Sequence, residues 1–312
     1  MSQSQPLRIE HPDVGSFATV RTINSQLLFV NNPTLEERVL GRLAQYQEKY
    51  EVELYAFVIM GNHYHPLTRF PKCNRAHFFR DLNARTAEAV RKLVPEFKGG
   101  PLVERRYSEQ ALPLDEDIEN QFFYSALQPV SSGLAERISD YPGYNSFDDA
   151  ITGRTRKIRQ VNWAAYNEAK RKGRRPRICD FYYYVELKYK RLPGYEALSQ
   201  KEYRKLMLKK FEERRQVILE EFAKQGYVFP TPEQLRRTKA SAFPKHTKKS
   251  ERYSKRPLVL SRCAEAKRAY LEWYFSIYHA YKEACRRYRA GDFGVEFPPR
   301  TYRPPGVAIH IH

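Results

Sequence analysis

The first half of the chain alternates short apolar runs with amphipathic segments. Apolar runs rich in β-branched and aromatic residues predict strands, and apolar positions three and four residues apart predict helices. In chain order the predicted elements are a strand over 15–30, a helix over 34–50, strands over 52–60 and 63–70, a helix over 74–93, a strand over 102–112 and a helix over 117–127. The order βαββαβ with one added helix indicates an α+β protein with a ferredoxin-like plan.

Local signals predict several boundaries of these elements. Thr34 and Glu37 have the spacing of a capping box, which predicts Thr34 as the N-cap of the first helix. The pair Gly61-Asn62 predicts a tight turn, so the strands on either side of it form an antiparallel hairpin. Pro129 predicts the end of the helix over 117–127, because proline disfavours helical continuation.

The second half reads as mostly helical. Ser199 and Glu202 form a second capping-box pair, and they open a helix expected to run to about residue 225, where Gly226 stops it. A short helix begins at Pro232, and a long one covers 262–289. The tyrosines at helical spacing in this last helix are expected to pack against the protein. The tail after it is expected to be extended.

Charge is distributed unevenly between the two halves. The net charge of the chain is +19, but residues 1–150 carry a balance of −4 and residues 151–312 a balance of +23. Two stretches, 154–177 and 236–256, hold ten and nine basic residues against one acidic residue each. Clusters of this kind are typical of surfaces that bind nucleic acid, although a solvated basic surface has the same composition.

The basic clusters supply the candidate DNA-binding residues. Trp163, Tyr166 and the run Tyr182 to Tyr184 lie among them, and bases of single-stranded DNA stack on such rings. The candidates are Arg154, Arg156, Lys157, Arg159, Arg171, Lys172, Arg174, Arg175, Arg177, Lys248 and Lys249.

Composition excludes several classes of protein. The chain is 41% hydrophobic, enough to form a core, and no apolar stretch is as long as the roughly 18 residues that a membrane helix needs. The four cysteines have no paired spacing, which argues against a disulfide framework. We therefore expect a cytoplasmic, nucleoid-associated protein without a membrane partner, and both a monomer and a homodimer are compatible with the sequence.

The motif GNHYH at residues 61–65 is the strongest candidate for chemistry. Residues i and i+2 of a strand point to the same face, so His63 and His65 can converge on one metal ion. A His-x-His pair alone is a weak signal, since a half-buried strand edge gives the same pattern. Some 60 residues later, FFYSALQPVSSGL places Tyr124 and Gln128 four residues apart, on one face of the predicted helix.

Together these residues resemble a known family. GNHYH followed by Y-x-x-x-Q-P-V-x-x-G-L is similar to the HUH endonucleases of the single-tyrosine transposase class, and most similar to the REP-associated tyrosine transposases. The resemblance covers roughly residues 15–150. Two positions depart from the family pattern: Gly61 stands where proline is usual, and Pro66 where leucine is usual. Because Pro66 cannot donate a ladder hydrogen bond, we expect a strand edge or a bulge there.

The resemblance implies a function and a site. His63, His65 and Gln128 would bind a divalent ion, Mg²⁺ or Mn²⁺, in keeping with the mixed nitrogen and oxygen ligation that these ions accept. Tyr124 would be the nucleophile that cleaves single-stranded or hairpin DNA, leaving a 5′-phosphotyrosine and a free 3′-OH. The metal would polarise a phosphate oxygen and assist the weakly nucleophilic phenol.

Three alternatives stay open. Cys73 and His77 follow the histidine pair and could belong to a structural zinc site, although the usual four-ligand spacing is absent. His310 and His312 form a second His-x-His pair at the last residues, with no partner motif downstream. The protein could also be a domesticated nucleic-acid-binding protein whose site is vestigial.

The same observations suggest a division of the chain. Residues 1–150 are expected to form the HUH transposase domain, 151–180 a basic linker, and 181–312 a helical, basic accessory region that binds DNA. Retention of both histidines together with Tyr124 and Gln128 favours a metal-dependent strand transferase over a binding protein.

Overall fold

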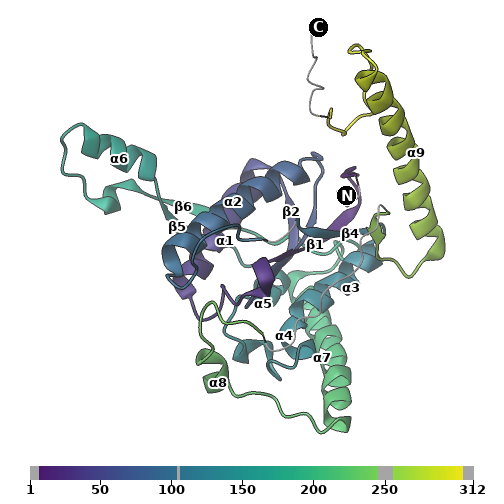
Figure 1. Ribbon diagram of the computed structural model, residues 1–312. Helices are drawn as coiled ribbons and strands as arrows, with labels where there is room; N and C mark the ends of the chain where they lie inside the picture. Colours follow the sequence, from purple (N-terminus) through teal and green to yellow (C-terminus); the bar gives the residue numbers. More distant parts are fainter. Residues whose placement is uncertain (1–6, 104–105, 245–255, 305–312) are drawn as a thin grey trace.

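The computed structural model describes residues 7–103, 106–244 and 256–304 (Figure 1). Its first half has the predicted order of elements. These are β1 (Gly15–Arg21), α1 (Pro33–Lys49), β2 (Glu53–Met60), β3 (His63–Arg69), α2 (Arg75–Leu93) and β4 (Ser108–Leu112). The strands lie in the order β2-β3-β1-β4, and β3 is antiparallel to both of its neighbours. The predicted α+β, ferredoxin-like plan is confirmed.

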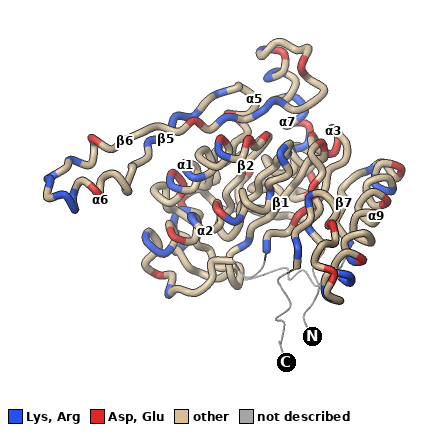
Figure 2. Tube along the Cα trace, turned by 90° about the horizontal axis from the view of Figure 1, so that it is seen from above, with Lys and Arg blue, Asp and Glu red and all other residues tan. Residues whose placement is uncertain are grey.

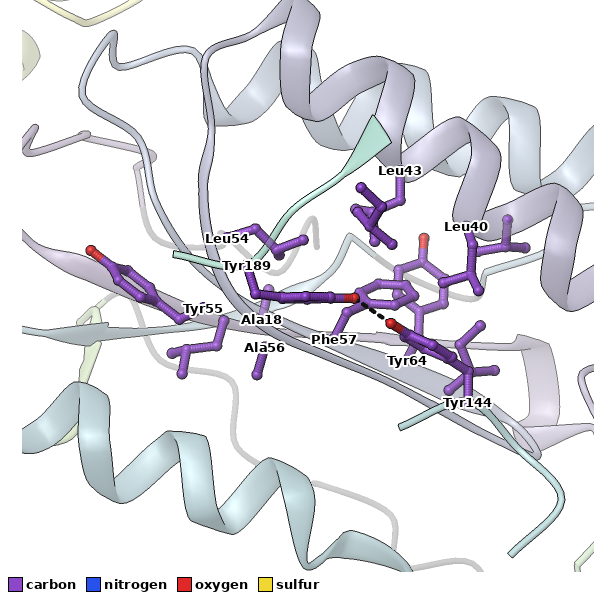
Figure 3. Packing of buried hydrophobic residues seen from close by; sticks show 14 of the residues in the cluster. Ala18, Leu40, Leu43, Leu54, Tyr55, Ala56, Phe57, Tyr64, Tyr144 and Tyr189 are labelled. Carbon is purple, nitrogen blue, oxygen red and sulfur yellow. Dashed lines mark hydrogen bonds between the residues drawn. The ribbon is translucent and has the colours of Figure 1, made fainter. Parts of the chain in front are cut away.

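The sheet separates two layers of helices. α1 and α2 cover one face, where Tyr64 of β3 packs against Phe57 and hydrogen-bonds to Asn83 of α2. Figure 3 shows Leu40 and Leu43 of α1 above this face. α3 (Asp115–Ala126) covers the opposite face and contacts all four strands. Residues on β3 therefore alternate between two environments, as the period of a strand requires.

Two boundaries at the start of the chain differ from the prediction. The strand expected over 15–30 ends at Arg21, because Asn24 and Ser25 have positive φ angles of 51° and 56° and form a 3₁₀ turn (Ile23–Ser25). The N-cap of α1 is Asn32, whose side chain accepts a hydrogen bond from the Leu35 N–H. The predicted N-cap, Thr34, was wrong. Pro33 takes the first helical position, which its fixed φ angle suits.

Proline positions account for two further differences from the prediction. The predicted helix does end before Pro129, at Ala126, but Pro129 has a second role. It lies near the start of a new short helix, α4 (Gln128–Ser131), after α3 has ended at Ala126. Pro66 lies in an inner strand, between β1 and β2, so the expected edge was wrong. The register does shift near it, but on the partner strand β2, between Leu54 and Ala56.

The segment expected as a basic linker is folded. After a 3₁₀ turn (Ile138–Asp140) and α5 (Phe147–Thr152), it forms an antiparallel hairpin that carries a helix at its tip. This arm consists of β5 (Arg156–Val161), α6 (Trp163–Arg171), a 3₁₀ turn (Ile178–Phe181) and β6 (Tyr182–Leu187). The arm projects from the body of the molecule, and its base packs on α1 (Figure 1).

The rest of the chain is mostly helical, as predicted. α7 (Gln200–Lys224) begins with the predicted Ser199–Glu202 capping box, and α8 (Pro232–Arg236) and α9 (Ala264–Arg289) follow. A two-residue strand, β7 (Leu258–Val259), joins the main sheet parallel to β4. Within the described ranges, no helix is long and apolar enough to cross a membrane.

One hydrophobic core includes residues from both halves of the chain. Phe147 of α5 packs against Phe211 of α7 with ring centroids 4.3 Å apart. The hydroxyls of Tyr144 and Tyr189 hydrogen-bond at 2.8 Å, as Figure 3 shows. The elements after residue 150 are therefore packed on the sheet and its helices, and are not attached by a linker alone.

Candidate functional site

His63 and His65 lie on the face of β3 that α3 covers. Their ring centroids are 4.6 Å apart, and the two planes are inclined by 78°. Tyr64 between them points to the opposite face. His65 is buried and His63 half-buried, so both imidazoles face a partly enclosed space between the sheet and α3. The two rings thus share one face of β3, as the i, i+2 spacing predicts.

Hydrogen bonds fix the protonated nitrogen of each ring. Nδ1 of His63 lies 2.5 Å from the side-chain oxygen of Asn62, and Nδ1 of His65 lies 3.3 Å from the carbonyl oxygen of Ala18. Both oxygens can only accept a hydrogen bond, so each Nδ1 must donate one. Thr19 Oγ1, at 3.0 Å, is a second neighbour of the His65 Nδ1. Each neutral ring then keeps a lone pair on Nε2, the arrangement that metal-bound histidines show.

Pro66 explains why the Ala18 carbonyl is available to His65. Thr22 N–H donates to the Asn62 carbonyl, so every second pair of residues along β1 and β3 exchanges ladder hydrogen bonds. The hydrogen-bonded pairs are then 22 with 62, 20 with 64 and 18 with 66, so an N–H at residue 66 would point at the carbonyl of Ala18. Proline has no N–H. The His65 ring hydrogen-bonds to the Ala18 carbonyl in place of the missing N–H. The proline that departs from the family pattern therefore frees the carbonyl that holds a candidate metal ligand.

The other departure, Gly61, has a packing cause. A β-carbon at this position would lie 2.9 Å from a methyl group of Val30 and 3.0 Å from one of Leu27. Any side chain here would displace the segment after β1. The turn that presents His63 is therefore tightly packed from behind.

The environment keeps both histidines neutral. Burial lowers the pKa of His65 to about 4; the positive charge of Arg21 contributes to this decrease, and the hydrogen bond to the Ala18 carbonyl opposes it. Burial also lowers the pKa of His63 well below its usual range, with contributions from His65 and from Arg21, which lies opposite it on β1. A neutral imidazole is the form that ligates metals, so no proton has to be displaced near neutral pH.

Tyr124 reaches the same region from the other side. It lies in the last turn of α3, and its ring meets the edge of Phe17 at 5.8 Å. Phe17, on β1, in turn stacks on His65 at 5.0 Å. The Tyr124 ring is 49% exposed, whereas Phe122 and Phe123 before it are buried. A tyrosine half open to solvent beside buried aromatic residues is accessible to a substrate.

Gln128 is close to Tyr124 in the chain but belongs to the next helix. Leu127 separates α3 from α4, and Gln128 begins α4. The expectation of one continuous helix face for the two residues was therefore wrong. Gln128 is 7% exposed, and its side-chain amide makes no hydrogen bond with a described residue. The amide oxygen of Gln128 has lone pairs that can serve a ligand.

The candidate DNA-binding residues have different environments. Arg154 and Arg156 form ion pairs with the buried Asp149, and Arg156 also lies over the ring of Tyr144. Arg156 therefore anchors the base of the arm. Arg159 stacks over Tyr182 at 4.5 Å.

The remaining candidates lie farther along the arm or outside the described residues. Lys157, Lys172 and Arg177 pair with acidic neighbours on the arm. Exposed basic residues gather at its tip (Figure 2), and they are Arg171, Arg174 and Arg175. Lys248 and Lys249, like His310 and His312, lie outside the described residues.

The arm and the histidine pair lie on different sides of the sheet. The base of the arm packs on α1, in the helix layer opposite α3 and Tyr124. The cations near Tyr124 are instead Arg214 of α7 and Arg262, which line a cleft together with it. Sequence reasoning missed these residues and Arg21, because isolated arginines far apart in the chain give no local signal.

Cys73 and His77 are engaged separately. The Cys73 thiol lies 3.7 Å from the Glu10 carbonyl oxygen, and the His77 ring packs edge-on against Tyr302. Among the described residues, no group of three or more histidine, cysteine, aspartate or glutamate side chains could hold a metal ion. This statement does not concern His63, His65 and Gln128, because the third of these side chains is an amide.

Comparison with known proteins identifies the first half of the chain. Residues 19–110 match the model of the family described as "Transposase IS200 like". This segment is therefore similar to the IS200-like transposases. The match runs from β1 to β4 and includes both histidines, and it ends before Tyr124. The match confirms the resemblance noted in the sequence, and it supports a transposase-type role in DNA processing.

Two solved structures are similar to part of this chain. One is described as a REP-associated tyrosine transposase bound to a REP hairpin; it is 18% identical, with a TM-score of 0.40, and the match covers 46% of this chain and 83% of that one. The other is a putative transposase from Deinococcus radiodurans R1, 16% identical with a TM-score of 0.28, covering 40% of this chain and 95% of that one. No match was found among curated proteins.

Proposed function

We propose that this protein is a metal-dependent endonuclease and strand transferase acting on single-stranded DNA. Tyr124 is the nucleophile, and His63, His65 and Gln128 hold a divalent ion, Mg²⁺ or Mn²⁺. The observation that carries the proposal is the chain of ring contacts from His63 through His65 and Phe17 to Tyr124. It brings two neutral imidazoles and an accessible phenol to one side of the sheet.

The side chains fit a divalent ion chemically. Both imidazoles present an unprotonated Nε2, and the Gln128 amide offers an oxygen that can accept a ligand. Three neutral ligands leave the ion its full charge. When bound, it supplies a Lewis acid that polarises a non-bridging oxygen of the scissile phosphate. Asn62 and Ala18 hold the imidazoles in the required orientation.

The reaction is a transfer of a phosphoryl group to Tyr124. Its Oη attacks the phosphorus and forms a new P–O bond, while the bond from phosphorus to the 3′ oxygen breaks. The phenolic proton passes to solvent, and the departing 3′ oxygen takes up a proton. The product is a 5′-phosphotyrosine and a free 3′-OH, and the covalent bond retains the energy needed for rejoining.

The placement of charge suggests a hairpin as substrate. The arm carries its exposed arginines on the side of α1, and Tyr124 lies on the side of α3. A purely single-stranded segment at Tyr124 would leave the arm without a partner. A hairpin with a single-stranded flank can place its stem against the arm and its flank at Tyr124, because phosphate contacts of the stem require only exposed cations.

The test is the replacement of Tyr124 by phenylalanine. The full-length protein is incubated with hairpin DNA and Mn²⁺, and covalent adducts are separated on a denaturing gel. Tyr124→Phe removes one oxygen, so it should fold, keep its DNA affinity within a few fold and form no adduct. An adduct of normal yield with this variant would show that another residue is the nucleophile.

Two further variants separate chemistry from folding. Phe123→Leu changes a buried ring next to Tyr124, and it should lower the free energy of unfolding by about 1 kcal/mol while adducts still form. His63→Ala should abolish Mn²⁺ binding in calorimetry as well as adduct formation, and EDTA should have the same effect on the unmodified protein. If the unmodified protein binds DNA but never forms an adduct, the site is vestigial and the protein only binds.

A further inference from the structure

A cleft of about 520 Å³ adjoins Tyr124 on α3. Its walls come from α3, from α7 and from residues 260–262, which directly follow β7. Tyr124 contacts Phe17, which stacks on His65, and it also lines this cleft. A molecule whose phosphate is attacked by Tyr124 must therefore continue into the cleft or pass beside it.

The lining of the cleft combines flat apolar walls with separate polar groups. Leu127, Val217 and Leu260 supply apolar surface, and Val217 is 57% exposed on α7. Exposed apolar surface in a concave site usually marks a ligand. Asn120 and Gln121 add amides that can donate and accept hydrogen bonds.

Two arginines give the cleft a positive charge. The Arg214 guanidinium lies over the buried Phe123 ring at 4.3 Å, which holds its plane in place. It also lies 3.6 Å from Glu119, so part of its charge is balanced. Arg262 is exposed and forms no ion pair with a described residue. Stacked guanidinium groups and apolar side chains are the surfaces on which unpaired bases lie.

We infer that this cleft binds the unpaired base next to the scissile phosphate. The inference rests on the proposed function of Tyr124. The base lies between the apolar walls and Arg214, its polar edge faces the amides of α3, and Arg262 contacts a flanking phosphate. The C-terminal half of the chain thereby completes the substrate site, because α7 and residues 260–262 form two of its walls.

The first experiment measures binding without chemistry. An oligothymidylate with 2-aminopurine at a central position is titrated in EDTA with the full-length protein and with two variants. Val217→Asp places a carboxylate in the cleft, whereas Leu208→Asp makes the same change at an exposed leucine of α7 outside the cleft. Val217→Asp should weaken binding by on the order of tenfold, the size of one stacking contact, and Leu208→Asp should not. Equal effects of the two variants would overturn the inference, whether or not the protein cleaves DNA.

The second experiment couples the cleft to cleavage. Adduct formation is measured on hairpin DNA with a normal or an abasic nucleotide on either side of the scissile phosphate. If the cleft binds that base, Val217→Asp and base removal each slow adduct formation, and their combination is no slower than either alone. Independent, multiplicative losses would overturn the inference even though Tyr124 remains the nucleophile. Absence of any adduct from the unmodified protein would instead overturn the proposed function, and the binding experiment would still decide the inference.

Discussion

Replacing Pro66 by alanine should weaken metal binding without weakening the fold. The change restores a backbone N–H that the β1–β3 ladder directs at the Ala18 carbonyl. In the unmodified protein this carbonyl accepts a hydrogen bond from the His65 ring at 3.3 Å. The new N–H competes for this oxygen at closer to ideal ladder geometry. The His65 ring then keeps only Thr19 as a partner for its Nδ1.

The sizes of the opposing effects can be estimated. A recovered ladder hydrogen bond stabilises by about 0.5–1.5 kcal/mol. Loss of the rigid proline lowers the free energy of unfolding by about 0.4–1 kcal/mol, because the unfolded chain gains conformational entropy. The two nearly cancel, so the unfolding free energy should change by less than about 1 kcal/mol. Loss of a hydrogen-bond partner behind a metal-bound histidine costs about 10–100-fold in affinity. Because Thr19 remains, we expect the lower end of that range.

Three measurements check this prediction. Calorimetry with Mn²⁺ gives the affinity, thermal unfolding gives the stability, and the ¹⁵N chemical shifts of His65 report which ring nitrogen carries the proton. Pro66→Ala should show a mixture of tautomers where the unmodified protein shows Nδ1–H alone. Pro232→Ala is the matched control, since Pro232 begins α8 far from the histidines.

The reasoning would be refuted by a single tautomer in Pro66→Ala and an unchanged Mn²⁺ affinity. A large loss of stability together with weaker Mn²⁺ binding would also contradict it, because the proline would then support the strand rather than release a carbonyl. Thr19→Val, which removes the other partner, should enlarge the loss of affinity when combined with Pro66→Ala.

Three further predictions concern stability and charge. Burial raises the pKa of Glu36 from 4.5 to about 7, because it disfavours the charged carboxylate. The stability that the neutral carboxyl group provides is therefore fully present below about pH 4.5 and is lost as the pH rises through 7. Glu36→Gln should therefore stabilise the protein by about 1–2 kcal/mol at pH 8 and by nothing at pH 4, in thermal melts, after a discount for its partial exposure. Asp149→Asn leaves two arginine partners unpaired, and urea unfolding should show a loss of about 3 kcal/mol. Replacing Arg171, Arg174 and Arg175 by glutamine should reduce the slope of log affinity against log salt by about 3 if each contacts a phosphate of the stem, and an unchanged slope would mean that these cations are only solvated.

Much of the fold could be predicted because its signals are local. The alternation of β3 alone places His63 and His65 on one face, and the periodicity of α1 and α2 identifies the layer behind the sheet. The error at Thr34 and the unexpected helix at Pro129 are also local in origin. Asn32 competes successfully as N-cap because Pro33 follows it, and a proline that can end one helix can equally begin the next.

The parts of the site that could not be predicted depend on contacts between distant segments. β7 has only two residues and therefore no periodic signal, yet its pairing with β4 places Leu260 and Arg262 beside Tyr124. The anchoring of His65 by Ala18 depends on the register between β1 and β3. That register could be derived only after the pairing of the two strands was known.

The position of the hydrophobic core bears on how the chain divides into domains. The family match stops at residue 110, and a boundary near residue 150 suits the motifs of the sequence. The packing of Phe147 against Phe211 and the hydrogen bond from Tyr144 to Tyr189 both cross that boundary. A chain cut there would expose these rings and lose two walls of the cleft beside Tyr124. The C-terminal half therefore belongs to the same structural unit as the histidine strand, and its basic arm is carried on that unit rather than on a separate domain.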